Sequence, residues 1–289
     1  MFQKLLYKFF EWKALFKKAQ KVEEKSPDLC ICTLFKNEAP FLKEWIEFHQ
    51  KQGFGKFYVI DNYSNDSFQT VLQPYIEAGL VTLLQTNTSD MSTAIQAGEY
   101  NRAIKQMRRQ EKEHTWVAFI DTDEFLFSVD EKKGIKEVLK DFSGQPIAAI
   151  LVNWLMFGTA DVEKLDEGKL LVEQLNKRAP DAHNEHHIFK SISYLPNIMG
   201  FVGGPHKPIA VAKAVFKYAD GQLFSKESDK WVHTPLRINH YWYRSEEYYR
   251  TQKIEKRKVF APSRDEKLEK WHKKRCNEVE DFEILKLNT

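Results

Sequence analysis

Short apolar segments alternate with helical patterns through the first half of the chain. The apolar segments, each of strand length and typical of buried strands, cover residues 29–35, 57–61, 80–84, 116–120 and 147–152. Segments with a helical period lie between them at residues 41–52, 70–78, 94–112 and 135–141. This alternation predicts an α/β fold with a mainly parallel sheet flanked by helices.

The second half is less regular. Residues 200–208 are rich in Gly and Pro and predict a loop, residues 238–242 are strand-like and aromatic, and residues 246–258 predict a basic helix.

Polar clusters follow three of the predicted strands. Asn37 and Glu38 follow the first, residues 61–66 end the second, and residues 121–124 follow the fourth. Parallel sheets bind ligands at the carboxyl ends of their strands, so these clusters predict a binding site there.

Asp121 and Asp123 are the clearest candidate for chemistry. Two carboxylates one residue apart on a turn can converge on a hard cation, and Mg²⁺ or Mn²⁺ takes one or two carboxylates together with substrate phosphates. A solvated acidic turn is the simpler alternative. Aspartyl-phosphate phosphatases also carry such a pair, but they need Thr or Val where this chain has Phe125.

Composition excludes several classes of protein. The chain has 289 residues, 29% charged and 42% hydrophobic, which excludes disordered and collagen-like chains. Its three cysteines form no disulfide framework and fit a reducing compartment. Neither a membrane-spanning apolar run nor a signal peptide is recognisable, so we expect a cytoplasmic protein.

Charge is unevenly distributed. Residues 1–25 carry a net charge of +4 and residues 248–275 carry +7, which leaves −8 on the remainder. Residues 1–26 predict an amphipathic basic helix that either packs on the domain or lies on an anionic membrane. The acidic centre and the lack of a recognisable motif argue against nucleic-acid binding.

Several motifs together resemble glycosyltransferase family 92 and its bacterial glycosyltransferase 2-like relatives. They lie at residues 34–49 (LFKNEAPFLKEWIEFH), 58–66 (YVIDNYSND), 116–126 (WVAFIDTDEFL), 152–158 (VNWLMFG), 190–192 (KSI), 205–206 (PH), 238–241 (INHY) and 277–281 (NEVED).

This resemblance implies a GT-A fold at residues 27–260, with a nucleotide-binding half at 27–152 and a less regular acceptor half at 153–260, followed by a C-terminal tail at 261–289. It also implies that Asp61 meets the nucleoside, that Asn37 and Glu38 border its pocket, and that His240 is a third metal ligand beside Asp121 and Asp123. A core histidine is the alternative for His240.

Further residues are candidates for the donor or the acceptor. Asn62, Gln96, Asn101 and Asp121 complete the residues expected at the donor nucleotide, although Gln96 and Asn101 also fit an ordinary polar helix face. Lys190 and His206 match family motifs and can contact phosphate or acceptor, and Lys253 and Arg257 can neutralise a diphosphate. A solvated basic face is the alternative for the last two.

The resemblance implies an inverting transferase, which needs a base to deprotonate the acceptor. Asp161 and Glu173 are the candidates, each with a surface acid as the alternative. We therefore predict a Mn²⁺- or Mg²⁺-dependent transferase that moves a hexose from a nucleotide sugar to a glycan or glycolipid, in bacterial lipopolysaccharide or capsule synthesis. It would be cytoplasmic and peripheral on the inner face of the cell membrane. The alternative is an inactive scaffold of the same fold that binds carbohydrate or membrane.

Overall fold

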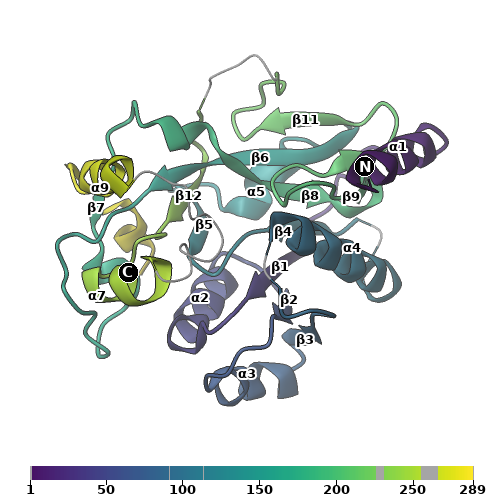
Figure 1. The fold of residues 1–289 in the computed structure, drawn as a ribbon. Helices are drawn as coiled ribbons and strands as arrows, with labels where there is room; N and C mark the ends of the chain where they lie inside the picture. Colours follow the sequence, from purple (N-terminus) through teal and green to yellow (C-terminus); the bar gives the residue numbers. More distant parts are fainter. Residues whose placement is uncertain (1, 91, 113, 226–230, 255–265, 289) are drawn as a thin grey trace.

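The computed structural model describes residues 2–90, 92–112, 114–225, 231–254 and 266–288. Strands and helices alternate through its first half (Figure 1). The strands are β1 (Leu29–Phe35), β2 (Lys56–Asp61), β3 (Val81–Gln85) and β4 (Trp116–Phe119), and the helices are α2 (Ala39–Lys51), α3 (Phe68–Glu77) and α4 (Thr93–Gln110). The bounds lie within two residues of those predicted from the sequence.

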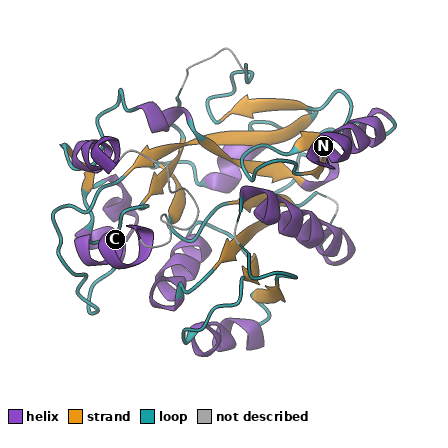
Figure 2. Ribbon diagram, in the orientation of Figure 1, coloured by secondary structure: helices purple, strands orange, loops and turns teal. Residues whose placement is uncertain are grey.

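One mixed sheet crosses the whole molecule (Figure 2). Its order is β3-β2-β1-β4-β8-β6-β12-β5, and β11 pairs with β6 off this path. The remaining strands of this sheet are β5 (Glu124–Ser128), β6 (Ile147–Met156), β8 (Phe189–Tyr194), β11 (Val215–Tyr218) and β12 (Leu236–His240). Strands β1 to β4 are parallel, whereas β8 runs antiparallel to both β4 and β6. The predicted α/β fold is therefore confirmed.

Two cores lie on opposite faces of this sheet, because successive side chains of a strand alternate in direction. On β1, Leu29, Ile31 and Phe35 join the core that includes α2 and α3. Cys30, Cys32 and Leu34 join the core under α4. Cys30 and Cys32 share one face as small apolar residues and are free thiols.

Helix α2 is bonded to β5, the strand that begins at the last residue of the acidic cluster at 121–124. Pro40 lies in its first turn, a position that needs no N–H donor. The Nε1 atom of Trp45 donates to the carbonyl of Glu124 at 2.8 Å. The backbone N–H of Leu126 donates to Nε2 of His49 at 3.1 Å. These two buried contacts fix β5 against α2 and so fix the start of β5 at Glu124.

The N-terminal helix is shorter than predicted. Helix α1 is Phe2–Leu15, rather than residues 1–26, and it lies beside β9 (Ile198–Gly200) and β10 (Ile209–Ala210). The helix ends early because the following residues bond to the domain: the N–H of Gln20 donates to Asn197 Oδ1 at 2.7 Å and that of Val22 to the Gln145 carbonyl at 2.9 Å. Among the described residues, no helix is long and apolar enough to cross a bilayer.

The described residues near the C-terminus also pack on the domain. The predicted basic helix at 246–258 is a short α7 (Glu246–Tyr248) followed by a π-helix, η3 (Tyr249–Ile254), and residues 255–258 lie outside the described residues. The segment 261–289, expected as a tail, contains α9 (Glu266–Arg275), β13 (Val279–Glu280) and η4 (Glu283–Asn288). Strand β13 pairs with β7 (Lys177–Arg178), and Asp281 forms ion pairs with Arg178 and Arg237.

Further short elements complete the described chain. They are α5 (Ile135–Lys140), α6 (Leu171–Gln174), η1 (Asn184–His187) and η2 (Leu195–Asn197).

Candidate active site

A cavity of about 820 Å³ opens at the carboxyl ends of β1 and β4. Both halves of the domain contribute to it. Its lining residues are Leu34, Phe35, Lys36, Glu38, Ser92, Thr93, Gln96, Asp121, Thr122, Asp123, Trp154, Lys190, Pro205, His206, His240, Trp242 and Lys253. Three acids, three lysines and two tryptophans in one cavity suit a polar ligand with an anionic part and a part that packs on aromatic rings.

A tight turn between β4 and β5 fixes the positions of the acidic residues Asp121, Asp123 and Glu124. Strand β4 ends at Phe119, and β5 begins at Glu124. The N–H of Asp121 donates to Oε2 of Glu124 at 2.9 Å, and the N–H of Glu124 donates to the Asp121 carbonyl at 3.1 Å. These bonds close the turn and hold Asp123 at its tip.

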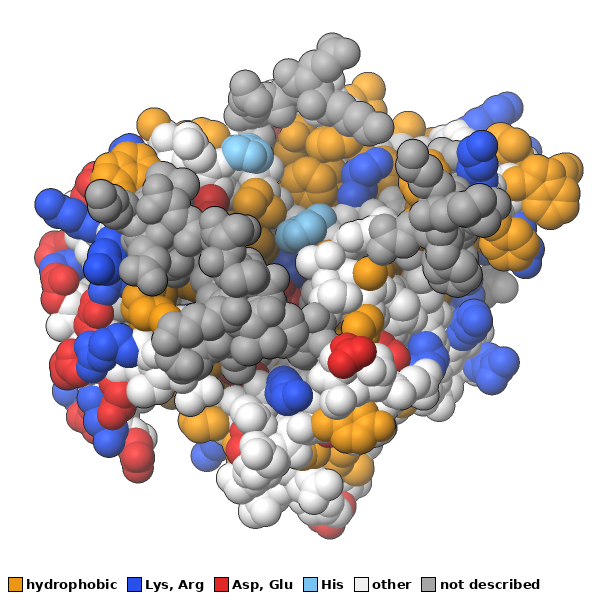
Figure 3. All heavy atoms as spheres, viewed as in Figure 1, with side chains coloured by type: hydrophobic (Ala, Val, Ile, Leu, Met, Phe, Trp, Pro, Cys, Tyr) orange, Lys and Arg blue, Asp and Glu red, His pale blue; other side chains and the backbone are white. Residues whose placement is uncertain are grey.

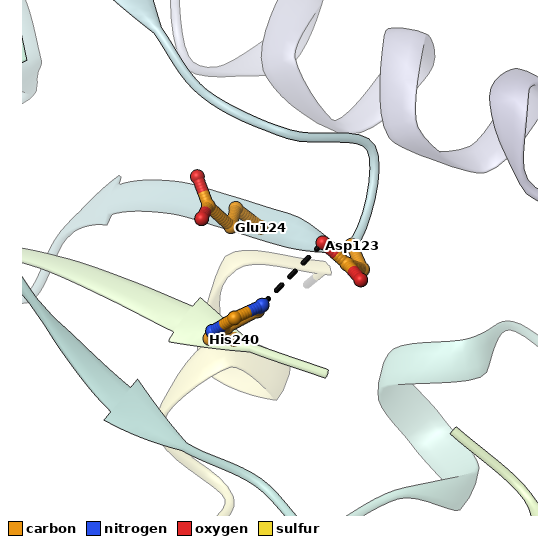
Figure 4. Close-up of side chains that lie close together, drawn as sticks. All are labelled: Asp123, Glu124 and His240. Atoms are coloured by element: carbon orange, nitrogen blue, oxygen red, sulfur yellow. Dashed lines mark ion pairs between the residues drawn. The ribbon is translucent and has the colours of Figure 1, made fainter. Parts of the chain in front are cut away.

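The neighbouring strand brings His240 to this turn. Strand β12 runs antiparallel to β5, with His240 paired with Glu124. The N–H of Tyr241 donates to the carbonyl of Asp123 at 2.8 Å. As a result, His240 Nε2 lies 3.5 Å from Asp123 Oδ1, and Figure 4 shows the two side chains pointing toward each other.

Asp123, Glu124 and His240 form a group that can hold a metal ion. All three are buried, and one ligand atom from each lies within 4.8 Å of the others. Two carboxylates and an imidazole suit a divalent cation, and His240 Nδ1 has no hydrogen-bond partner among the described residues. The donor set therefore fits a divalent cation; it includes Asp123 and His240 from the predicted ligands and adds Glu124, whereas Asp121 lies outside this group.

Asp121 is engaged by two other side chains. Its Oδ1 accepts from Gln96 Nε2 at 2.7 Å, and its Oδ2 accepts from Lys190 Nζ at 2.7 Å. Lys190 is also 3.5 Å from Glu124 Oε1. Burial disfavours the ammonium of Lys190, but the carboxylates of Asp121 and Glu124 outweigh it and raise the pKa of Lys190, which stays charged.

Lys253 engages Asp123. Its Nζ donates to Asp123 Oδ2 at 2.9 Å and lies 4.9 Å from the centre of the Trp242 ring. Burial opposes ionisation of Asp123, yet Lys253 and His240 outweigh it and hold the pKa of Asp123 well below its ordinary value. Asp123 is therefore a carboxylate at neutral pH, as a metal ligand must be.

Glu124 has the opposite shift. Burial raises the pKa of Glu124 to about 7, and the negative charges of Asp121 and Asp123 add to this, while Lys190 partly offsets it. The pKa values of the neighbouring residues Asp123 and Glu124 therefore shift in opposite directions, a pattern found at functional sites.

Among the residues predicted to meet the nucleotide, the cavity gathers Glu38, Gln96 and Asp121 but not Asn37, Asp61 or Asn62. Asp61 Oδ1 accepts from the N–H of Ser64 at 2.9 Å, and Asn62 Nδ2 donates to the Asp90 carbonyl at 2.9 Å. Asn37 Oδ1 accepts from the N–H of Asn65 at 2.8 Å. These three hold the turns beside the cavity.

Three other predicted residues, Asn101, Asp161 and Glu173, are not brought to the cavity. Asn101 donates to the Phe201 carbonyl at 2.8 Å and accepts from its N–H at 2.6 Å, so it anchors the loop that leads to His206. Asp161 pairs with Lys177 at the surface, with a side chain 72% exposed. Glu173 caps its own short helix by accepting from the N–H of Leu170. Arg257 lies outside the described residues.

Two residues at or next to the cavity were assigned no role from the sequence. Glu124 was grouped with the acidic residues 121–124, and the structure shows that it begins β5. Arg244 is fully buried, pairs with Glu38 and stacks on Phe41, with 3.6 Å between guanidinium and ring centre. No local pattern marks Arg244, because its partner lies two hundred residues away.

The family model described as glycosyltransferase family 92 matches residues 28–286. The chain belongs to glycosyltransferase family 92. The match includes most of the segment that the sequence analysis set apart as a tail, in agreement with its packing. Arg178 and Asp281, the pair that joins this segment to the domain, lie inside the match.

The chain is similar to curated family 92 proteins of plants. A family 92 protein of Ricinus communis is 30% identical over 142 residues, covering 48% of this chain and 24% of that protein. One of Oryza sativa subsp. japonica is 30% identical over 122 residues, covering 42% and 20%. The chain therefore spans about a quarter of the length of the curated relatives it matches.

Among solved structures, the chain is similar to TarS of S. aureus. A structure of TarS residues 1–349 aligns with a TM-score of 0.34 and 17% identity, covering 64% of this chain and 47% of that one. The same protein in complex with UDP-GlcNAc aligns with a TM-score of 0.29 and 23% identity, covering 39% and 30%.

Proposed function

We propose that this protein transfers a sugar from a nucleotide-sugar donor, bound with a divalent cation in the cavity, to a hydroxyl of a glycan or glycolipid. One observation carries the proposal: a carboxylate–imidazole group able to hold a cation lies in the same cavity as the ammonium groups of Lys190 and Lys253. A nucleoside diphosphate requires both, because its oxygens bind the cation and accept charge-assisted hydrogen bonds.

Asp123, Glu124 and His240 would hold the cation, which we expect to be Mn²⁺ or Mg²⁺. When bound, it would supply charge stabilisation for the departing diphosphate. Lys190 and Lys253 would add positive charge on the same diphosphate, in a cavity where burial strengthens such interactions. Trp154 and Trp242 offer aromatic faces for the sugar ring.

The finer parts of the proposal rest on the resemblance to family 92 and its bacterial relatives. They are a hexose as the transferred sugar, inversion at the anomeric carbon, and lipopolysaccharide or capsule synthesis as the process. A nucleic acid is not among the proposed partners, because the acidic centre of the chain opposes it.

A catalytically silent scaffold that binds carbohydrate or membrane is the second candidate. The observation in its favour is that Lys190 and Lys253 already neutralise Asp121 and Asp123. Such a site is stable without a cation. Hydrolysis of a nucleotide sugar in the presence of Mn²⁺ separates the two candidates, because only an enzyme consumes the donor.

The test is a thermal-shift screen with Mn²⁺ or Mg²⁺ alone, with UDP, and with UDP-GlcNAc, UDP-glucose, UDP-galactose and GDP-mannose. A ligand that binds the folded state alone raises its melting temperature. We expect a nucleotide shift that depends on the cation in the wild-type protein and none in Asp123→Ala. Equal nucleotide shifts in the presence of EDTA would refute the cation-dependent site.

We also propose that helix α1 rests on an anionic membrane at the cytoplasmic side. Phe9, Trp12 and Phe16 are exposed by 48%, 57% and 75%. Phe9 and Trp12 lie three residues apart on one side of α1, and Phe16, just beyond its end, contacts Trp12 with ring centres 5.1 Å apart. Lys8 and Lys13 flank them and are exposed as well. Figure 3 shows hydrophobic and basic side chains together at the end of the molecule where Figure 1 places α1.

Aromatic rings with lysines around them suit the boundary between lipid headgroups and acyl chains. The opposite side of the helix is taken by the domain, since Ala14 is buried and its carbonyl accepts from the N–H of Ala212 at 3.1 Å. Helix α1 therefore packs on the domain along one side and exposes Phe9 and Trp12, the residues that we propose to contact lipid.

A further inference from the structure

His206 lies in the cavity in a fixed orientation. Its Nδ1 is 3.0 Å from the carbonyl of Phe189, the residue before Lys190 on β8. A carbonyl oxygen only accepts, so Nδ1 carries the proton and Nε2 of the neutral ring keeps its lone pair. The loop that carries His206 is anchored by the two hydrogen bonds between Asn101 and Phe201.

The other carboxylates and the other imidazole that line the cavity either belong to the metal-holding group or already accept from neighbouring side chains. Asp123 and His240 belong to the metal-holding group, and both oxygens of Asp121 accept from Gln96 and Lys190. In Glu38, Oε1 accepts from the Tyr248 hydroxyl at 3.1 Å, and Oε2 pairs with Arg244. Within the described part of the chain, Nε2 of His206 has no such partner.

Trp154 links the ring of His206 to the metal-holding group, because it contacts both His206 and His240. Trp154 contacts His206, with ring centres 5.5 Å apart, and His240, with ring centres 4.2 Å apart. A sugar on Trp154 would therefore have the metal-holding side of the cavity and His206 as neighbours. Burial lowers the pKa of His206, the positive charge of Lys190 lowers it further, and the ring is neutral at pH 7.

We propose that His206 is the general base that deprotonates the acceptor hydroxyl, a role that rests on the proposed transferase function. Nε2 takes the hydroxyl proton as the acceptor oxygen forms a bond to the anomeric carbon. The bond from that carbon to the diphosphate oxygen breaks, and its electron pair leaves with the nucleoside diphosphate, whose charge Lys190 and Lys253 share. The imidazolium then releases its proton to solvent.

The variant that tests this is His206→Asn. The amide nitrogen of asparagine takes the place of Nδ1 and can keep the hydrogen bond to the Phe189 carbonyl, while the atom that accepts the proton is lost. Exposed His187 lies outside the cavity, so His187→Asn makes the same chemical change as a matched control. Each protein is assayed with Mn²⁺ and the donors named above, for hydrolysis and for nucleotide binding.

We expect donor hydrolysis to fall by about 10²- to 10⁴-fold in His206→Asn, the usual contribution of a general base, with an unchanged thermal shift from UDP and Mn²⁺. Sodium azide needs no deprotonation, so it should restore consumption of the donor and yield a glycosyl azide. His187→Asn should behave as wild type.

Two results would overturn the role of His206. The first is a rate of hydrolysis in His206→Asn within a few-fold of the wild-type rate. The second is a loss of hydrolysis that azide does not restore, which would indicate a structural role for His206. A wild-type protein that neither binds UDP with Mn²⁺ nor consumes any of the donors would instead refute the proposed function itself.

Discussion

Lys253 donates from Nζ to Oδ2 of Asp123 at 2.9 Å, so the carboxylate best placed to bind a cation is already paired with an ammonium group. A cation and Lys253 must therefore compete for Asp123. Binding of a diphosphate would resolve the competition, because phosphate oxygens offer the displaced ammonium a new partner.

This competition predicts opposite effects in Lys253→Met. Mn²⁺ alone should bind about tenfold more tightly, since a partly buried ion pair worth about 1.4 kcal/mol no longer has to break. UDP in the presence of saturating Mn²⁺ should bind at least tenfold more weakly, because a charge-assisted hydrogen bond is lost. Calorimetric titration measures both affinities.

Lys177→Met is the control for this change. Lys177 pairs with exposed Asp161 outside the cavity, and its loss should alter neither affinity. Weaker binding of Mn²⁺ alone in Lys253→Met would show that the two cations do not compete.

His240→Ala should separate metal binding from stability. His240 Nε2 faces Asp123, and its loss should weaken Mn²⁺ binding by at least tenfold while changing the melting temperature little. His233→Ala is the contrasting variant, because His233 Nε2 donates to the Trp154 carbonyl at 2.9 Å and should matter for stability alone. The reverse pattern in the two variants would identify His240 as a core histidine.

The local pattern predicted most of the first half of the fold. Buried strands of the first half are continuous apolar runs, and their flanking helices carry a clear period. The strands of the second half were harder to predict: β8 (FKSISY) mixes polar and apolar residues, because Lys190 on it turns to Asp121. A buried lysine that pairs with a distant carboxylate cannot be recognised from the periodicity of polar and apolar residues around it.

The site was predictable to a similar extent. Asp123, His240, Gln96, Lys190, His206 and Lys253 all line or enter the cavity where strand ends and motifs placed them. The proximity of Glu124 to Asp123 and His240 was not predictable, because it depends on the pairing of β5 with β12. The prediction that Asp161 is the general base depended on its sequence position alone. The structure places Asp161 at the surface beside Lys177.

Stability should fall on acidification because of His49. Burial lowers the pKa of His49 to about 3, although its hydrogen bond to the Trp45 carbonyl opposes the shift. In the unfolded chain the ring titrates near pH 6.5, so between pH 6.5 and 3 the unfolded state binds the additional proton and the free energy of unfolding decreases as pH falls. This histidine alone should cost about 2 kcal/mol at pH 5.

Urea unfolding of metal-free protein at pH 7 and pH 5 measures this effect. His49→Gln should be less stable at pH 7, because the imidazole that joins α2 to β5 is lost, yet should show a smaller decrease between the two pH values. An undiminished decrease in the variant would assign the acid sensitivity to other buried histidines, such as His186 and His233.

The last prediction concerns the binding of the exposed side of α1 to a membrane. Replacing Phe9, Trp12 and Phe16 together by Ser should lower binding to vesicles of anionic lipid by at least tenfold, because three exposed aromatic rings can no longer enter the interface. The melting temperature should hardly change, since these rings are solvated in the free protein. Sedimentation with phosphatidylglycerol vesicles at low and high salt measures the binding, which should weaken with salt in the wild-type protein. Phe282→Ser, at an exposed phenylalanine far from α1 in sequence, should bind vesicles as the wild type does; equal binding by the triple variant would show that α1 does not face lipid.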